Sequence, residues 1–321
     1  MSPQTGRRPI RCPQESAVPK CSVVISTYNR RELLRRTLDS LTRQTLPRTD
    51  FEVLVCDDGS SDGTGDMVVG YADRIDVHHL YQEDLGARVS AARNMGITAA
   101  RGEVCVFLDD GVVAAPDCLR AHVEAHEAAD GPLALIGYVW AYTPHHDVSA
   151  EDAARMEQIL DRSDADELIA WLRADGRLPD FREEYYAKYG DDFGTEPAPW
   201  SIFWTCNVSA PTEMIREVGM FDQGFRGWGG EDCDLGYRLH RAGAYVALSR
   251  AAAAVHMPHP GASKSEEAYN YAYMADKYDT PITRLLHRYT SLEVNPFNIN
   301  DVIKAEGLPS CAEYEAQAAA R

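Results

Sequence analysis

The stretch G-E-V-C-V-F-L-D-D-G, Gly102–Gly111, decides the fold. Its five consecutive apolar residues, Val104–Leu108, predict a short strand buried on both faces, as in a parallel sheet. Asp109 and Asp110 follow directly. Ligands of open α/β sheets bind outside the carboxyl ends of the strands. Two carboxylates at that place therefore suit a metal ion, a ribose or a phosphate-bound cation. The alternative is an acidic turn after a core strand, because D-D-G is a common turn sequence.

The segments before this strand alternate between apolar runs and helical patterns. Strands are expected at Cys21–Ser26, Phe51–Cys56, Ile75–Tyr81 and Val104–Leu108. Helices are expected after Asn29, near Gly65–Ala72 and over Val89–Ala100, and Asn29 with Glu32 resembles a capping box at the start of the first. This β-α-β-α order predicts a mostly parallel sheet covered by helices. The second strand also ends in paired acids, Asp57 and Asp58, so two strands present carboxylates at one edge.

The second half of the chain continues as mixed strands and helices. Helices are expected over Pro116–Ala129, Ser149–Asp175 (two short ones) and Thr212–Val218, and strands over Leu133–Trp140, Phe203–Ser209, Ala244–Leu248 and Ala251–His256. From Ser265 the pattern is helical. Phe181–Trp200 is rich in aromatic residues and predicts a loop, either a flexible segment near a binding cleft or an ordinary surface connection.

A second informative stretch runs from Phe221 to Leu239, F-D-Q-G-F-R-G-W-G-G-E-D-C-D-L-G-Y-R-L. Three glycines surround Trp228, and Glu231 and Asp232 then open a helix that Gly243 ends. Acids in a first turn are stabilised by the helix dipole, so a purely capping role is the alternative to a catalytic one.

Composition limits the partners and the compartment. The 321 residues carry a net charge of −18, which argues against nucleic acid or an anionic membrane as the main partner. None of the eight cysteines forms a C-x-x-C pair, which favours a reduced, cytoplasmic protein. No apolar run approaches 18 residues, so we expect no membrane span. Residues 1–19 are expected to be a disordered lead-in.

Five motifs in order resemble the family-2 glycosyltransferases with the GT-A (nucleotide-diphospho-sugar transferase) fold, in a soluble bacterial member. They are S-V-V-I-S-T-Y-N-R (Ser22–Arg30), V-C-D-D-G-S-S-D-G-T (Val55–Thr64), A-A-R-N-M-G (Ala91–Gly96), V-F-L-D-D-G (Val106–Gly111) and G-W-G-G-E-D-C-D-L-G-Y-R-L (Gly227–Leu239). The resemblance covers residues 20–260. It implies one domain with a nucleotide-sugar-binding half (20–130) and an acceptor-binding, catalytic half (131–260), followed by a helical extension (261–321).

The resemblance also implies roles for individual residues. Those expected to bind the nucleotide are Thr27, Tyr28, Arg30, Asp58, Arg93 and Asp109. Asp232, with Glu231 beside it, is expected to be the catalytic base of an inverting enzyme. Residues expected on the acceptor or sugar side are Trp228, Gly230 and Asn207.

A divalent metal, Mn²⁺ or Mg²⁺, is the expected cofactor, since it stabilises the charge of a leaving diphosphate. The family's D-x-D motif would place an acid at position 111, where this chain has glycine. The resemblance implies that Asp110 and His256, together with the donor's own phosphates, hold the metal.

The predicted reaction moves a sugar from a UDP-sugar to a hydroxyl or amine of a small molecule, a glycan or a protein, and a homodimer is one option. Two alternatives stay open. A sugar nucleotidyltransferase would carry a Gly-rich loop after the first strand, where this chain has S-T-Y-N-R-R-E. A nucleotide-sugar-binding protein with weak or no catalysis is the other, because of Gly111.

Overall fold

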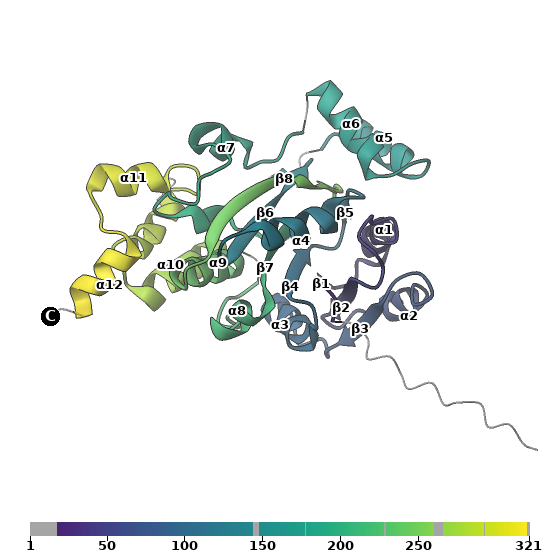
Figure 1. Ribbon diagram of the computed structural model, residues 1–321, viewed down its shortest axis with the longest axis horizontal. Helices are drawn as coiled ribbons and strands as arrows, with labels where there is room; N and C mark the ends of the chain where they lie inside the picture. Colours follow the sequence, from purple (N-terminus) through teal and green to yellow (C-terminus); the bar gives the residue numbers. More distant parts are fainter. Residues whose placement is uncertain are drawn as a thin grey trace, which may run out of the picture.

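The computed structural model describes residues 18–143, 148–176, 178–227, 229–259, 266–291 and 293–319. An eight-stranded sheet forms the centre of this part of the chain (Figure 1). In chain order its strands are β1 (Cys21–Thr27), β2 (Phe51–Asp57), β3 (Val77–Tyr81), β4 (Val104–Leu108), β5 (Val112–Ala114), β6 (Leu133–Trp140), β7 (Asn207–Pro211) and β8 (Tyr245–His256). In space the order is β3-β2-β1-β4-β7-β6-β8-β5.

The first four strands pair in parallel, as their alternation with helices predicts. β7 runs antiparallel to both β4 and β6, whereas β8 runs parallel to β6. Therefore β6 and β8 point in the same direction as β1, β2 and β4. The α/β class is confirmed, with a mixed second half of the sheet.

The short connection Asp109–Gly111 curls the sheet. It joins β4 directly to β5, which lies at the far end of the spatial order. Three residues span only about 10 Å, so the far end must bend back toward the end of β4. The backbone N–H of Met257 donates to Gly111 O (2.9 Å), and Val112 pairs with His256. This closure places the end of β8 beside the D-D-G turn.

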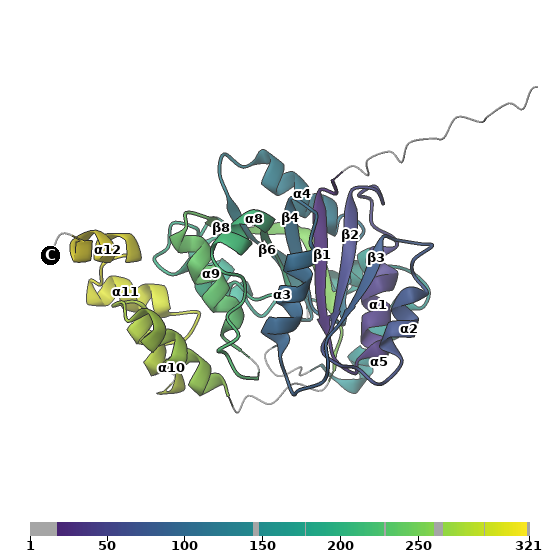
Figure 2. The ribbon, with the colours of Figure 1, turned by 90° about the horizontal axis from the view of Figure 1, so that it is seen from below.

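Helices cover both faces of the sheet (Figure 2). Those before β8 are α1 (Arg31–Leu41), α2 (Thr64–Val69), α3 (Val89–Ala99), α4 (Cys118–Ala128), α5 (Ala150–Leu160), α6 (Ala165–Asp175), α7 (Glu183–Tyr189), η1 (Pro199–Ile202), α8 (Thr212–Glu217) and α9 (Glu231–Arg241). Those after it are α10 (Glu267–Tyr278), η2 (Thr283–Ser291), α11 (Ile299–Glu306) and α12 (Cys311–Ala319). Of the described helices, none combines the length and apolar character needed to cross a bilayer.

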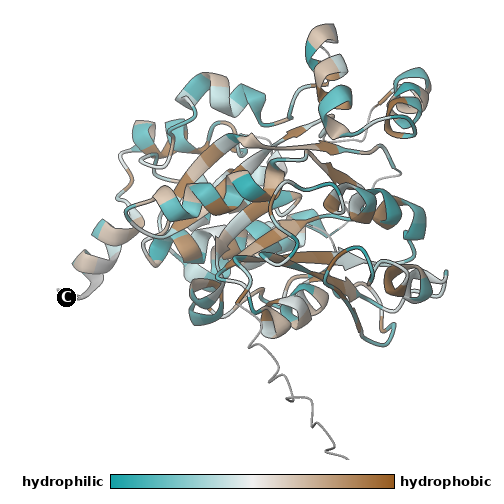
Figure 3. Cartoon of the chain, turned by 45° about the vertical axis from the view of Figure 1, so that its right-hand side comes forward, coloured by the Kyte–Doolittle hydropathy of each residue, from teal (hydrophilic) through white to brown (hydrophobic). Residues whose placement is uncertain are grey.

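The alternation of side chains along β1 explains why both faces are apolar. Val23 and Ile25 pack with α1, α2 and α4, whereas Val24 packs with α3, α8 and α9 on the other face. In Figure 3 the strands are correspondingly brown and the outer helical surfaces largely teal. The predicted strand Val104–Leu108 is buried at every position.

Several local predictions were wrong. Asn29 is not the N-cap of the first helix: it takes a left-handed φ of +50°, its side chain accepts from Ser61 N (2.8 Å), and Arg30 is the cap. Asp62, from the loop after β2, instead accepts from Arg31 N (3.0 Å). The capping group therefore comes from a segment that sequence spacing does not reveal.

The aromatic segment Phe181–Trp200 is only in part a loop. It contains α7 and the start of η1, and its aromatic rings enter the core, with Tyr185, Phe193 and Trp200 fully buried. The strand expected at Phe203–Ser209 begins only at Asn207, and the two short strands expected near the end are one continuous β8. β5 was not predicted.

Candidate active site

The carboxyl ends of the parallel strands meet at one edge of the sheet. β1 ends at Thr27, β2 at Asp57, β4 just before Asp109, and β8 at His256, while Tyr142 lies two residues beyond β6. This edge is where α/β folds bind ligands. It is also where most of the predicted site residues lie.

Arg93 joins the two acidic motifs into one cluster. Its Nη1 donates to Glu231 Oε1 (2.9 Å) and its Nη2 donates to Asp109 Oδ1 (3.2 Å). The guanidinium lies over the ring of Phe221 (5.3 Å), whose backbone N–H and carbonyl are both held by the Asn94 amide. Arg93 and Glu231 are buried, but the Asp109 side chain keeps 35% of its exposure. Asp109 is therefore the member of the cluster that a ligand can reach.

Asp232 sits in the first turn of α9, beside this cluster. Gly230 precedes the helix with φ +90°, and a Cβ there would lie 3.2 Å from the ring of Phe225. Oδ1 of Asp232 accepts from Cys233 N (2.7 Å), and the backbone of Thr205 also bonds to this carboxylate. Burial and then the neighbouring Glu231 charge raise the pKa of Asp232 to about 7, against the opposing effect of Arg93. A carboxyl group with this pKa exchanges its proton near neutral pH.

The two carboxylate oxygens of Glu231 differ in their hydrogen bonding. Oε1 accepts from Arg93, but Oε2 is buried and has no hydrogen-bond partner among the described residues. A buried acceptor of this kind is costly unless a ligand fills it. The start of α9 therefore presents two adjacent carboxylates, Glu231 bonded to Arg93 and Asp232 with a raised pKa.

A second group of predicted residues surrounds Asp110. Thr27 Oγ1 donates to Asp110 Oδ2 (2.8 Å) and Arg30 Nη1 donates to Asp110 Oδ1 (3.1 Å). Burial raises the pKa of Asp110 to about 6 despite the Arg30 charge and the Thr27 hydrogen bond. Tyr28 is exposed next to them, with its hydroxyl donating to Asp84 Oδ2 (2.8 Å).

The acids after β2 hold the loop of which they are part. Asp57 Oδ1 accepts from Ser60 N (2.7 Å), and Oδ2 bonds to His79 Nε2 (2.9 Å). Asp58 accepts from Arg88 N (2.7 Å) and from the Gln82 amide. Both carboxylates are buried, so Asp58 has a structural role here, besides the nucleotide binding that the family resemblance implies.

The predicted metal ligands lie near one another along the backbone but are not assembled as a set. Val112 pairs with His256, so His256 lies beside the D-D-G turn, and its ring centroid is 5.4 Å from that of Tyr142. Within the described ranges, the group of acids and histidines whose ligand atoms all lie within 4.8 Å of one another is Glu52, Asp76 and His78. That group already contains an Arg101 guanidinium, which bonds to Glu52 and Asp76.

Two of the three residues expected on the acceptor side have described positions. Gly230 is the left-handed residue before α9. Asn207 does not face the site: its amide donates to Ala252 O (2.9 Å) and accepts from His122 (2.9 Å) in the core. The Asn207 amide packs directly against Gly137. A Cβ at position 137 would lie 2.2 Å from Asn207 Nδ2, so this close contact requires glycine. Trp228 lies outside the described residues.

Sequence reasoning missed an aromatic group at the same edge. Trp204 stacks on Phe181 (6.1 Å between centroids, 20° between planes), with Phe297 against both and Tyr142 beside Trp204 (6.0 Å). These four rings are partly exposed, and Trp204 precedes the Thr205 that bonds to Asp232. Flat apolar faces of this kind suit sugar rings. The position of Tyr142 after the end of β6 is the sequence signal that could have located the group.

Arg182 lies beneath these rings, 5.6 Å from Tyr142 and 5.8 Å from Trp204. It is fully buried and pairs with Asp180 through Nη2 (2.8 Å). The pair fixes the segment before α7 to β6, because Asp180 also accepts from Val139 N (2.8 Å).

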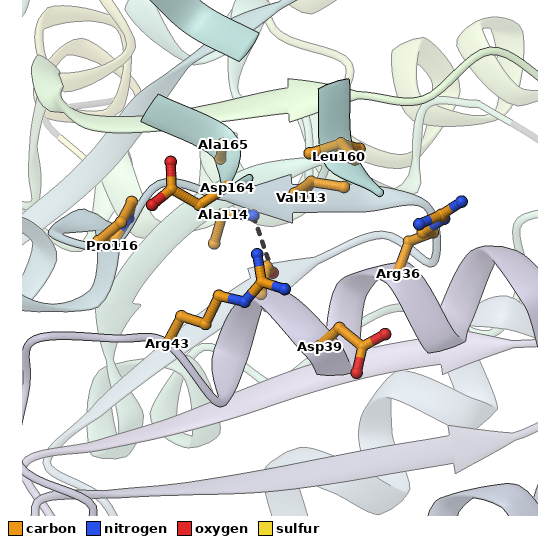
Figure 4. Close-up of a pocket in the computed structure, with 10 residues that line it drawn as sticks. Arg36, Asp39, Arg43, Val113, Ala114, Pro116, Leu160, Asp164 and Ala165 are labelled. Carbon is orange, nitrogen blue, oxygen red and sulfur yellow. Dashed lines mark hydrogen bonds between the residues drawn. The ribbon is translucent and has the colours of Figure 1, made fainter. Parts of the chain in front are cut away.

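The hollow in Figure 4 is not this site. It is a cavity of about 40 Å³ between α1, β5 and the α5–α6 pair, lined by Arg36, Arg43 and Asp164 among others. Arg36, one of the lining residues, pairs with Asp161 at the end of α5 (2.8 Å). A wider depression of about 440 Å³ is lined by Asn94, Phe221 and Lys277 among others. The first is a packing gap between helices, and neither contains the acidic cluster.

Comparison with known proteins assigns the chain to a family. Residues 22–170 match the family model "Glycosyl transferase family 2", and residues 192–260 match "N-terminal domain of galactosyltransferase". The uncharacterized glycosyltransferase YfnE of Bacillus subtilis is 32% identical over 281 residues, covering 81% of this chain and 71% of that protein. The chain belongs to the family-2 glycosyltransferases. The prediction from the five motifs is thereby confirmed.

Other relatives of this glycosyltransferase are larger proteins. Validoxylamine A glucosyltransferase of Streptomyces hygroscopicus subsp. jinggangensis is 41% identical over 249 residues, and the match covers 76% of this chain but 57% of that protein. Chondroitin synthase of Escherichia coli is 30% identical over 248 residues, which is 35% of its length. The glycosyltransferase described here thus spans little more than half of its validoxylamine relative.

Solved structures show the same fold at low identity. Staphylococcus aureus TarS superposes with a TM-score of 0.56 at 16% identity, covering 81% of this chain and 39% of that one. A mannosyltransferase from Pyrobaculum calidifontis, in complex with GDP-Man and Mn²⁺, gives 0.53 at 19% identity and covers 97% and 79%. The predicted GT-A fold of this glycosyltransferase is confirmed.

Proposed function

We propose that this glycosyltransferase moves a sugar from a UDP-sugar to an acceptor hydroxyl with inversion, and that Asp232 is the general base. The observation that carries the proposal is the position of Asp232 in the first turn of α9, next to Glu231, which Arg93 joins to Asp109 at the end of β4. Burial and the Glu231 charge raise the pKa of Asp232, in keeping with this position. A base must remain ionised yet accept a proton as the acceptor oxygen attacks, and a pKa near the working pH meets both needs.

The other residues divide into donor and acceptor roles. Thr27, Tyr28, Arg30 and Asp58 lie at the ends of β1 and β2, which suits binding of the nucleoside. Arg93 holds Asp109 and Glu231 in place and brings positive charge toward the diphosphate. Trp204 precedes Thr205, whose backbone bonds to Asp232, and Tyr142 packs against Trp204; these partly exposed rings suit a sugar face.

A divalent metal fits the chemistry of the residues at the D-D-G turn. Asp109 retains an accessible carboxylate, Asp110 is buried with an elevated pKa, and His256 lies next to the turn through the β5–β8 pairing. Carboxylate and imidazole donors suit Mn²⁺ and Mg²⁺. Asp109, Asp110 and His256 would hold the ion, with Asp110 giving up its bonds to Thr27 or Arg30. When bound, the ion would act as a Lewis acid toward the diphosphate.

For the acceptor we propose a small polyhydroxylated molecule, with validoxylamine A as the first one to test. Support comes from the 41% identical relative named as validoxylamine A glucosyltransferase. UDP-glucose is the corresponding first donor.

The test is a UDP-release assay with UDP-glucose and validoxylamine A on the wild type and on Asp232→Asn. We expect the wild type to release UDP and a glycosylated product, and the variant to lose turnover at least 100-fold while its Kd for UDP stays within about twofold. Full turnover by Asp232→Asn would remove Asp232 from the base role. Release of pyrophosphate would instead support a sugar nucleotidyltransferase, and binding of UDP-sugars without turnover on a broad acceptor panel would support a binding protein.

A further inference from the structure

We propose that Asn270 in α10 is a positioning residue for the catalytic carboxylate, so that a helix following the matched catalytic region completes the active site. The proposal rests on the proposed role of Asp232. It concerns the segment Arg226–Gly230, called here the glycine loop, which leads directly into α9.

The described residues of the glycine loop, Arg226, Gly227, Gly229 and Gly230, belong to no helix or strand. Gly227, Gly229 and Gly230 take φ values of +57°, +97° and +90°, which residues with a Cβ rarely adopt. Backbone groups in such a segment need partners from elsewhere in the fold. The conformation of the loop determines where α9 begins, because Gly230 is its cap.

Asn270 supplies those partners. It is fully buried, and its Oδ1 accepts from Arg226 N (3.0 Å). Its Nδ2 donates to Arg226 O (2.8 Å) and to Gly229 O (2.7 Å). One amide therefore holds both ends of the segment Arg226–Gly229. A Cβ at Gly230 would lie 3.4 Å from Asn270 Cβ, so the contact continues to the helix cap.

Helix α10 also contacts α9 at a second place, one that includes neither Asp232 nor the glycine loop. Lys277 Nζ and Tyr278 Oη donate to Asp234 Oδ1 (2.8 and 2.7 Å), and Cys233 and Tyr237 of α9 pack with Tyr271 and Met274 of α10. In Figure 2, α10 lies beside α9. The bonds of Lys277 and Tyr278 to Asp234 stabilise the helix pair, and these side chains do not bond to the glycine loop. A variant at this contact is therefore a matched control.

The expected effect falls on the chemical step. Small misplacements of a catalytic group, of about 1 Å, cost on the order of 100-fold in rate. Asn270→Ala should therefore lower kcat by about 10- to 100-fold. The Kd for UDP should stay within about twofold, because the residues predicted to bind the nucleoside lie at the ends of β1 and β2.

The experiment compares Asn270→Ala with Tyr278→Phe in the full chain. For each variant, kcat is measured by UDP release, the Kd for UDP by calorimetry, the Tm by thermal unfolding and the hydrogen exchange of residues 226–235 by mass spectrometry. We expect both variants to lose Tm, but only Asn270→Ala to lose kcat and to exchange faster in the loop. Asn270→Ser replaces Asn270→Ala if the latter does not fold.

Two results would overturn the proposal. One is an equal kcat for the two variants at matched Tm, and the other is unchanged exchange of residues 226–235 in Asn270→Ala. Measuring the effect of Asn270→Ala in the Asp232→Asn variant separates the positioning role of Asn270 from the role of Asp232 as base. If Asn270 acts through Asp232, its removal should change the residual rate of Asp232→Asn by less than about twofold. Should Asp232→Asn itself retain full activity, the base assignment fails, while hydrogen exchange still decides whether Asn270 holds the loop.

Discussion

Replacing Glu231 by glutamine should move the acid limb of the activity profile to lower pH. The limb of kcat/KM reports the pKa of the essential base in the free enzyme. In the wild type, burial is the largest cause of the raised pKa of Asp232, the Glu231 charge is the second, and Arg93 opposes both. Glu231→Gln removes the second cause and leaves Arg93 with one carboxylate fewer to neutralise it. Both changes lower the pKa of Asp232.

The size of the shift follows from the charges. The rise from 3.8 to about 7 corresponds to about 4 kcal/mol between the two protonation states. Two unit charges at about 4 Å interact by about 4 kcal/mol at an effective dielectric of about 20, so a neighbouring carboxylate somewhat farther away raises a pKa by about two units. Since burial remains, we expect the limb to move from about pH 7 down by about one to two units.

The assay is UDP release at limiting donor from pH 5 to 9, at constant ionic strength. The control is Glu213→Gln, which removes a charge from an exposed ion pair on α8. A limb that does not move in Glu231→Gln, or that moves upward, refutes the reasoning. A limb near pH 6 in both the wild type and Glu231→Gln would indicate that Asp110 is the titrating group, since Glu231 is not among the causes that raise the pKa of Asp110.

Three further predictions address stability and the metal. His122 is fully buried and its pKa is lowered to about 4; because the unfolded chain then binds more protons between pH 6.5 and 4, stability is lost as pH falls through that window. The wild type should lose free energy of unfolding in urea between pH 7 and pH 4.5, and His122→Gln should make this loss smaller by about 2–3 kcal/mol. An equal loss in both proteins would contradict the prediction. Gly137→Ala should destabilise by about 1–3 kcal/mol in the same assay, because the added Cβ would lie 2.2 Å from Asn207 Nδ2 and 2.5 Å from Ala252 O. Gly131→Ala, where nothing lies within 4 Å, should stay within about 0.5 kcal/mol, and equal effects would refute the packing argument. Removal of divalent ions with EDTA should abolish UDP release, Mn²⁺ or Mg²⁺ should restore it, and Asp109→Asn should weaken that restoration; activity indifferent to EDTA would exclude the proposed metal role.

The first half of the fold was predictable because its signals are local. The continuous apolar runs of β1, β2 and β4 bury both faces of a parallel sheet, and this pattern stands in the sequence itself. The three residues of β5 carry no periodic signal, and their pairing with β8 depends on closure of the sheet. α7 was missed because its aromatic residues face a core assembled from distant segments.

The candidate site divides in the same way. The motifs identify Asp109, Arg93 and Glu231 one by one, but the ion pair between Arg93 and Glu231 spans 138 positions. Likewise, the side chains that hydrogen-bond to the backbone of these elements come from distant segments. Asp62 bonds to the start of α1, and Asn270 bonds to the glycine loop. Sequence spacing can name such residues only when a family pattern already links them.

The turn Asp109–Gly111 limits how this enzyme can diversify. Its length is set by the jump from β4 to β5, and Gly111 takes φ +94° to make it. An inserted residue would shift β5 against β8 and reverse which side chains face the interior. Variation that preserves the fold must therefore exchange side chains at constant length. Under the proposed metal role of Asp109 and Asp110, a change of cation preference is thus expected to arise by substitution at these two positions, whereas loops that no strand register constrains can also change in length.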